Sequence, residues 1–162
     1  MAKRIAILGS TGSIGCNALE VIEHLGADFR AVALTARKQA DKLLEQVRRH
    51  RPAAVAVSDE ADESLVREIE KLNARVYRGA AGLVEMVQRD DVDQVLAAIV
   101  GAAGLPAVFA AVRAGKHIAL ANKEALVIAG SLLIPEVLDN FQRIAADRSG
   151  RSEDGNPFRQ RR

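Results

Sequence analysis

The sequence is poor in several residue types that mark particular classes of protein. Its 162 residues include a single cysteine, which excludes an internal disulfide framework and a zinc module built on several cysteines. Only 3% of the residues are aromatic and none is tryptophan, so stacking of bases or sugars on aromatic side chains is a poor prediction. The net charge of +2 is too small to indicate nucleic acid as a partner.

The chain also lacks a long apolar segment. No stretch approaches the roughly 18 uninterrupted apolar residues of a membrane span, and the first patterned strand begins at Ile5, which leaves no room for a signal peptide. We therefore expect a cytoplasmic protein that does not contact a membrane. The content of 49% hydrophobic and 27% charged residues is that of a globular domain.

What the sequence does contain is an alternation of short apolar runs with longer helical patterns. Strands are predicted at residues 5–8, 30–35, 53–57, 75–77, 95–100 and 117–121. Helices are predicted at residues 12–25, 38–49, 59–72, 80–88 and 106–114 and from residue 124, the third of them capped by Ser58 or Asp59. This alternation predicts an α/β fold with a doubly wound parallel sheet of the Rossmann type.

A glycine-rich segment joins the first predicted strand to the first predicted helix. Residues 9–15 read Gly-Ser-Thr-Gly-Ser-Ile-Gly. Glycines at this place permit a tight turn, let the backbone approach a pyrophosphate, and let the helix pack close to the strand, while the helix N-terminus offers unpaired N–H donors. The spacing differs from the usual G-x-G-x-x-G, but the position favours dinucleotide binding over a plain glycine turn.

Two cations follow the second predicted strand, where the ribose of such a cofactor would lie. A site selective for NAD carries Asp or Glu there to bind the ribose 2′-hydroxyl, whereas this chain continues as Arg37-Lys38-Gln39 with no carboxylate before Asp41. Arg and Lys bind phosphate through charge-assisted contacts. The sequence therefore favours NADP. The alternative is an incidental pair of surface cations at a helix start, where the helix dipole opposes them.

Two further segments follow strands that end on the same side of the predicted sheet. Residues 101–106, Gly-Ala-Ala-Gly-Leu-Pro, are small enough to let a flat cofactor ring pass, or to let a helix pack tightly on the sheet. Asn122, Lys123 and Glu124 follow the last predicted strand. Their side chains suit an amide, a ribose or a phosphate, but the same residues also suit an ordinary helix start. The residues alone leave both alternatives open.

Three motifs together resemble a known family. They are Gly-Ser-Thr-Gly-Ser-Ile-Gly at residues 9–15, Ala-Ile-Val-Gly-Ala-Ala-Gly-Leu at 98–105 and Leu-Ala-Asn-Lys-Glu-Ala-Leu-Val at 120–127. In order and spacing they are similar to the N-terminal domain of 1-deoxy-D-xylulose 5-phosphate reductoisomerase, over about residues 4–135. The resemblance implies an oxidoreductase that uses NADPH and Mg²⁺ or Mn²⁺. Its product would be 2-C-methyl-D-erythritol 4-phosphate, in non-mevalonate isoprenoid biosynthesis.

The resemblance also implies roles for individual residues. Those that would contact NADPH are Thr11, Gly12, Ser13, Ile14, Arg37, Lys38, Gln39, Asn122 and Glu124. The first four would hold the pyrophosphate, and the next three would lie on the side of the 2′-phosphate, where many relatives have Gly-Lys-Asn. Lys123 would contact the sugar-phosphate substrate. No residue of this chain is expected to be catalytic.

The chain departs from the family pattern at about Glu136. The family continues with a Pro-Val-Asp-Ser-Glu-His segment, whose Asp and Glu bind the metal, and then with a catalytic and a helical domain. That segment is not present, and the remaining carboxylates form no adequate site for a hard divalent ion, so no metal ligand is expected here. We expect residues 1–135 to be an NADPH-binding domain, inactive alone, left by a truncation or frameshift.

The last residues differ in character from the rest. Residues 136–162 are predicted to be a divergent helix followed, from about Asp147, by an Arg-rich tail without apolar periodicity, which is typical of disorder. The family is homodimeric, which raises the same expectation for a complete relative. The alternative function is a non-catalytic NADP-binding sensor or interaction module whose tail recruits a partner.

Overall fold

The chain folds around one parallel sheet. The computed structural model of the protein describes residues 2–121. The strands are β1 (Lys3–Leu8), β2 (Phe29–Thr35), β3 (Ala54–Val57), β4 (Arg75–Arg78), β5 (Gln94–Ala97) and β6 (His117–Leu120). Within the same residues the α-helices are α1 (Ser13–Leu25), α2 (Ala40–His50), α3 (Glu63–Lys71), α4 (Gly79–Val87) and α5 (Leu105–Arg113), with 3₁₀ turns at Gly26–Asp28 and Ala102–Gly104.

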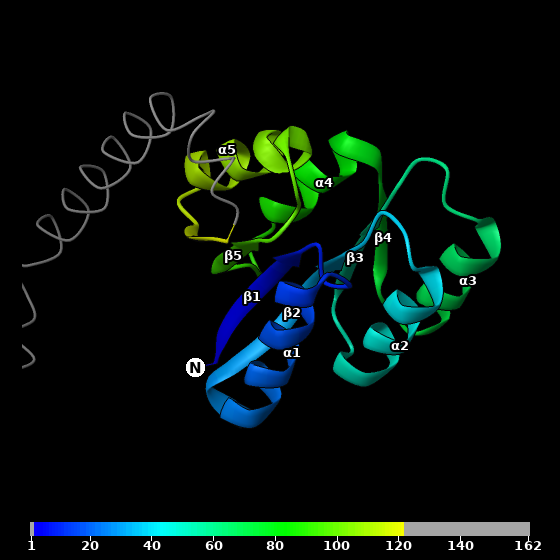
Figure 1. Cartoon of the computed structure of the whole chain (residues 1–162), viewed down its shortest axis with the longest axis horizontal. Helices are drawn as coiled ribbons and strands as arrows, with labels where there is room; N and C mark the ends of the chain where they lie inside the picture. The colour runs from blue at the N-terminus through cyan, green and yellow to red at the C-terminus, as the bar shows by residue number, and fades with distance from the viewer. Residues whose placement is uncertain (1, 122–162) are drawn as a thin grey trace, which may run out of the picture.

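The order of the strands places a ligand crevice beside β1. The strands lie in the order β4-β3-β2-β1-β5-β6, and each neighbouring pair is parallel. After β4 the chain crosses back over the sheet and sets β5 on the other side of β1 (Figure 1). The loops that follow β1 and β5 therefore leave the sheet in opposite directions, which opens a crevice at the carboxyl ends of these strands. The predicted doubly wound α/β fold is confirmed.

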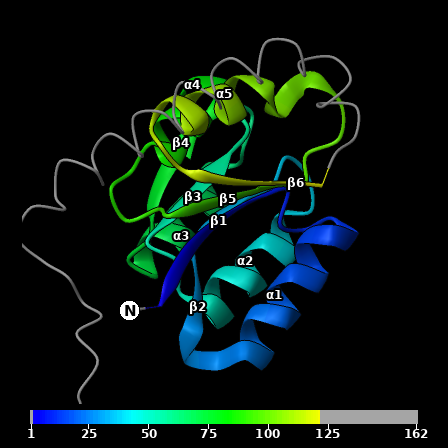
Figure 2. The ribbon, with the colours of Figure 1, turned by 90° about the vertical axis from the view of Figure 1, so that its left-hand side faces the viewer.

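Helices cover both faces of the sheet, which explains why its central strands β1, β2 and β3 contain continuous apolar runs. Successive side chains of a strand point to opposite faces, so Ile5 and Ile7 pack with α1, α2 and α3, while Ala6 and Leu8 pack with α4 and α5. Figure 2 shows these two helical layers on opposite sides of the strands. Because both faces are buried there, residues 5–8, 31–34 and 54–57 carry no polar alternation, whereas the outer strand β4 begins and ends with arginine.

Two boundaries differ from the predictions for a physical reason. The third helix begins at Glu63 and is capped by Asp62, whose Oδ1 accepts a hydrogen bond from the Ser64 backbone N–H at 2.7 Å, so the prediction of a cap at Ser58 or Asp59 was wrong. The fifth strand ends at Ala97, and Val100 is 84% exposed. The end of that apolar run therefore belongs to a loop at the crevice and not to the sheet.

Candidate functional site

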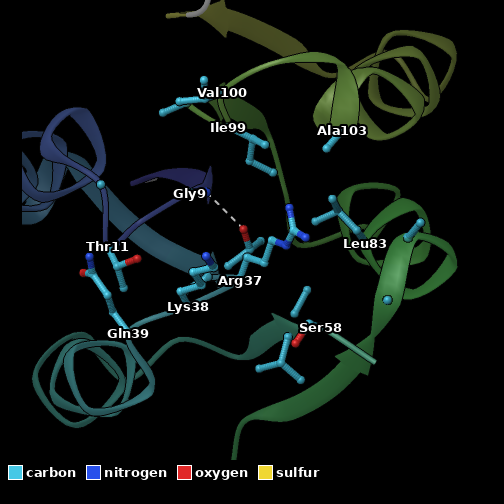
Figure 3. Close-up of a pocket in the computed structure, with 18 of the residues that line it drawn as sticks. Gly9, Thr11, Arg37, Lys38, Gln39, Ser58, Leu83, Ile99, Val100 and Ala103 are labelled. Atoms are coloured by element: carbon cyan, nitrogen blue, oxygen red, sulfur yellow. Dashed lines mark hydrogen bonds between the residues drawn. The ribbon is translucent and has the colours of Figure 1, made fainter. Parts of the chain in front are cut away.

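A cavity of about 560 Å³ opens at the carboxyl ends of the strands. Its walls come from the loops that follow β1, β2, β3 and β5 and from the first residues of α4 (Figure 3). These segments are far apart in the sequence and meet because parallel strands present all their carboxyl ends on one side of the sheet. Every loop that was predicted to bind the cofactor and lies within residues 2–121 borders this cavity or the helix beside it.

The glycine loop after β1 can adopt its shape only with glycine at two positions. Gly9 has φ +83°, and a Cβ there would stand 2.8 Å from the Ala98 carbonyl oxygen, on the loop after β5. A Cβ on Gly15 would collide with the Gly9 carbonyl oxygen and lie 2.6 Å from the Ser10 Cα. The predicted tight turn and the close packing of α1 on the loop are both confirmed.

Gly12 has a different role, because its conformation does not require glycine. Its φ of −71° is open to any residue, and a Cβ there would meet only the Gly9 carbonyl oxygen, at 3.4 Å. It is the N-cap of α1 and provides no side chain to satisfy the first N–H groups of the helix. The N–H groups of Ser13, Ile14 and Gly15 have no partner within the helix, and the first intrahelical bond runs from the Cys16 N–H to the Gly12 carbonyl at 2.9 Å. The helix therefore presents free N–H groups and its positive dipole end beside the cavity.

Buried hydrogen bonds fix the loop from the side of β2 and α2. The Ser10 N–H donates to the Thr35 carbonyl at 2.8 Å, and the Gly9 N–H donates to the Thr35 hydroxyl at 3.0 Å. From α2, the Gln46 amide donates to the Ser10 carbonyl at 2.9 Å and the Lys42 amine donates to the Thr11 carbonyl at 3.0 Å. Sequence reasoning missed Lys42 and Gln46. The available signal was a glutamine beside Leu43 and Val47 on the apolar face of α2.

The cations after β2 line the cavity and have no partner in the part of the chain that the structure describes. Arg37, Lys38 and Gln39 all line it, and Figure 3 shows the Arg37 side chain extending across it toward Ile99 and Leu83. Within residues 2–121, neither Arg37 nor Lys38 forms a hydrogen bond or an ion pair. Gln39 adopts the left-handed conformation, φ +64°, as the N-cap of α2. Exposed cations at a helix N-terminus raise the electrostatic energy unless an anion lies nearby.

The opposite wall consists of small and apolar residues. Ala98, Ile99, Val100 and Ala103 line the cavity in the segment after β5. A Cβ on Gly104 would lie 3.3 Å from the Cβ of Ile99, so this glycine lets the start of α5 pack against the loop. The two alternatives for this segment are therefore compatible, since small residues serve helix packing and also border the cavity.

A third part of the lining was not foreseen from the sequence. Ser58 and Asp59 follow β3, and Gly79, Ala80 and Leu83 begin α4. Gly79 has φ +62°, and a Cβ there would collide with the Asp59 carboxylate. No motif connects these two segments, which become neighbours because β3 pairs with β4.

The predicted site residues fall into three groups. Five line the cavity, namely Thr11, Gly12, Arg37, Lys38 and Gln39. Ser13 and Ile14 lie in the first turn of α1 with exposed side chains, Ile14 being 45% exposed. Asn122, Lys123 and Glu124, like the tail, lie outside the described residues.

The described residues contain neither a cluster of metal ligands nor a membrane-spanning helix. No three His, Cys, Asp or Glu side chains between residues 2 and 121 are grouped so that they would hold a metal ion. No helix in the same range is long and apolar enough to cross a membrane.

Comparison with known proteins points to one family. A family model described as 1-deoxy-D-xylulose 5-phosphate reductoisomerase matches residues 5–130. The reductoisomerase of Laribacter hongkongensis is 44% identical over 143 residues, which are 88% of this chain and 37% of that protein. The enzyme of Bacteroides fragilis is 48% identical over 132 residues, 81% of this chain and 34% of that protein. The chain thus spans about a third of the length of these curated relatives.

Solved structures agree with this comparison. A DOX-P reductoisomerase in complex with NADPH, fosmidomycin and magnesium superposes with a TM-score of 0.81 at 40% identity, over 85% of this chain and 34% of that one. The enzyme from Zymomonas mobilis in complex with NADPH gives a TM-score of 0.80 at 35% identity, over 86% of this chain and 37% of that one.

Proposed function

The chain belongs to the 1-deoxy-D-xylulose 5-phosphate reductoisomerase family, and from that premise we propose that the cavity at the carboxyl ends of its strands binds NADPH. The observation that carries this proposal is the pairing of two features in one cavity. A glycine loop backed by the N-terminus of α1 lies on one side, and Arg37 and Lys38, which have no partner within residues 2–121, lie on another. The first suits a pyrophosphate and the second suits an additional phosphate. Two relatives of known structure are described as complexes with NADPH.

Different segments of the cavity bind different parts of the cofactor. In this proposal, the segment Thr11 to Ile14 holds the pyrophosphate through backbone N–H groups. Arg37 and Lys38, with Gln39 beside them, hold the 2′-phosphate. We further propose that Asn122 and Glu124 contact the cofactor and that Lys123 contacts the sugar-phosphate substrate; the family match over residues 5–130, which includes these positions, supports this.

In this proposal the chain contributes cofactor binding to the reaction. The groups that act on the substrate are not assigned to its described residues. NADPH provides a hydride, and the described residues orient its phosphates. The family reaction, from 1-deoxy-D-xylulose 5-phosphate to 2-C-methyl-D-erythritol 4-phosphate, is proposed for the complete enzyme. Solved relatives contain magnesium, but residues 2–121 offer no group of His, Cys, Asp or Glu ligands for it. We assign the metal, whether Mg²⁺ or Mn²⁺, to a part of the enzyme other than these residues.

The domain assignment belongs to the same proposal. We take residues 1–135 as the NADPH-binding domain and residues 136–162 as a tail outside it, and we place the protein in the cytoplasm. The homodimer is proposed for the complete enzyme. No observation favours a purely sensory NADP-binding role over the family function.

Titration of the purified chain with NADPH and NADH tests the proposal. We expect the nicotinamide fluorescence of NADPH to change on binding, with a dissociation constant at least 10-fold lower than that for NADH, because one phosphate contact contributes about 1.5–3 kcal/mol. Failure to bind either dinucleotide would contradict the proposal. Equal binding of both would contradict the roles given to Arg37 and Lys38.

A further inference from the structure

We propose that Lys42 and Gln46, two residues of α2 outside the cavity lining, are positioning residues that hold the glycine loop in the shape that receives the cofactor pyrophosphate. Neither residue belongs to a motif that indicates the cofactor, and both act on the loop through its backbone carbonyls. The inference rests on the proposed binding of NADPH for its functional meaning. The geometry on which it stands is independent of that proposal.

Gln46 provides the buried contacts between α2 and the glycine loop. It is 8% exposed and Ser10 is fully buried, so both must satisfy their polar groups within the protein. The Ser10 hydroxyl lies 2.7 Å from Gln46 Oε1, while Gln46 Nε2 donates to the Ser10 carbonyl at 2.9 Å. Gln46 therefore binds one residue of the loop through both ends of its amide. A leucine of similar size would fill the space and leave the Ser10 carbonyl without this donor.

Lys42 provides the more exposed contact between α2 and the glycine loop. It lies four residues before Gln46, so both side chains project from the same face of α2. Its Nζ donates to the carbonyl of Thr11, the next residue of the loop, at 3.0 Å. Gln46 and Lys42 together thus fix two consecutive carbonyls of the loop. With these carbonyls turned toward α2, the loop backbone is held just before the free N–H groups that begin α1.

The position of Lys42 is unfavourable for the isolated helix. It lies in the first turn of α2, where the positive end of the helix dipole repels a cation. Within residues 2–121 it has no carboxylate partner, and its contact is the loop carbonyl. A bound pyrophosphate would supply the missing negative charge. The same amine would then position the loop and contribute favourable charge to the binding of the dinucleotide.

A second ligand separates the positioning of the glycine loop from binding of the 2′-phosphate. NADPH carries both a pyrophosphate and a 2′-phosphate, whereas 2′-AMP carries only the latter. Loss of Gln46 should therefore weaken NADPH and leave 2′-AMP unaffected. Loss of Arg37 or Lys38 should weaken both ligands. A general loss of folded protein would also weaken both ligands.

The experiment compares Gln46→Leu and Lys42→Met with the unaltered chain. We expect the dissociation constant of NADPH to rise about 10-fold in each, which corresponds to the loss of one or two hydrogen bonds. The constant for 2′-AMP, followed by nuclear magnetic resonance, should change less than twofold in Gln46→Leu. Lys42→Arg, which keeps a donor for the Thr11 carbonyl, should restore NADPH binding. Gln88→Leu, the same replacement at an exposed position on the end of α4, is the matched control and should bind normally.

Amide hydrogen exchange supplies a readout that needs no cofactor. The Ser10 N–H bonds to the Thr35 carbonyl and the Gly12 N–H to the Gly9 carbonyl, so both report the shape of the loop. Their exchange should accelerate in ligand-free Gln46→Leu, while the amides of β3 keep their protection. Unchanged exchange of these two amides, or NADPH affinity within twofold of the unaltered chain in both variants, would overturn the inference. Absence of NADPH binding by the unaltered chain would defeat the proposed function, and the exchange result would still decide the positioning role.

Discussion

Cations at the two ends of the parallel strands differ in whether a carboxylate neutralises them. At the amino ends, Arg4 binds Asp93 through two side-chain hydrogen bonds of 2.7 and 3.0 Å, and Arg89 binds Asp91 through two of 2.7 Å. At the carboxyl ends, Arg78 binds Glu63 at 2.6 Å, but Arg37 and Lys38, which border the cavity, have no such partner within the described residues. The comparison is therefore between the paired Arg4 and Arg89 and the two cations beside the cavity.

The pairs at the amino ends have consequences that the carboxyl ends lack. The hydrogen bond from Arg4 lowers the pKa of Asp93 to about 2, and that from Arg89 lowers the pKa of Asp91. Arg89 also donates to the Tyr77 hydroxyl at 3.1 Å, which ties the end of α4 to β4. Arg4 and Arg89 thus use their charge to hold elements together. Within the described residues, Arg37 and Lys38 keep their charge available for a ligand.

The largest effect should come from adding one methyl group where the glycine loop meets α1. In Gly15→Ala the new Cβ would collide with the Gly9 carbonyl oxygen and lie 2.6 Å from the Ser10 Cα, both of them backbone atoms that cannot rotate away. We expect a loss of about 3 kcal/mol in the free energy of unfolding, measured by urea denaturation. Gly12→Ala is the control, because its Cβ would be 3.4 Å from the nearest atom and should leave stability unchanged. Equal stability of the two variants would contradict the close packing.

Removing the cations of the carboxyl ends should affect binding and not folding. In the double variant Arg37→Ala with Lys38→Ala, we expect the dissociation constant of NADPH to rise about 10- to 100-fold, because charge-assisted contacts to the 2′-phosphate are lost. The melting temperature should stay constant or rise, since these side chains bond nothing in residues 2–121. Replacing Arg48 and Arg51, exposed cations toward the other end of α2, provides the control. A similar loss of NADPH affinity in that control would show that the overall positive charge, and not contacts from Arg37 and Lys38, causes the effect.

Removing a cation of the amino ends should do the reverse. In Arg89→Met, loss of the bonds to Asp91 and Tyr77 should lower the free energy of unfolding by about 1–2 kcal/mol. NADPH affinity should be unaltered, because Arg89 lies at the opposite end of the sheet from the cavity. Arg67→Met on α3, an exposed arginine, controls for the loss of charge. A drop in the NADPH affinity of Arg89→Met with no loss of stability would contradict the different roles given to cations at the two ends of the sheet.

The smallest effect should be a pH dependence at the far end of α2. The His50 side chain is 9% exposed, and burial lowers its pKa, opposed by nearby Glu23 and reinforced by Arg49. Because the unfolded chain then binds the proton more readily, this contribution to stability is complete above the ordinary histidine pKa of about 6.5 and is lost as the pH falls below it. His50→Gln should remove that part of the pH dependence in thermal denaturation. An identical pH profile for the variant and the unaltered chain would show that His50 does not contribute.

The sequence predicted more of the fold than of the site. Runs such as Ile5 to Leu8 are short, apolar on both faces and bounded by glycine, which together favour a buried parallel strand. The glycine loop was predictable because its tight turn imposes backbone requirements, which Gly9 and Gly15 meet. The cap of α3 was misplaced because Ser58, Asp59 and Asp62 all have suitable side chains, and only packing decides where a helix begins.

The rest of the site depends on contacts between segments distant in sequence. Gln46 lies 36 residues from Ser10, and its amide differs from an ordinary surface amide only because α2 buries it against the loop. Asp59 and Gly79 become neighbours through the pairing of β3 with β4. No local pattern indicates the contact of Asp59 with Gly79, and for Gln46 the local signal is confined to its place on the apolar face of α2, which does not reveal its partner.

By itself, the sequence determined the alternation of strands and helices, the glycine loop and the cations after β2, since each depends on neighbouring residues or on a local backbone requirement. The tertiary structure decided that these segments share one cavity and which residues hold the loop in place. It also decided that Arg4 and Arg89 are paired, while Arg37 and Lys38 have no partner among residues 2–121. The reason is physical. The sequence specifies which side chains are charged, but a charge is neutralised only if folding places an opposite charge within about 4 Å of it.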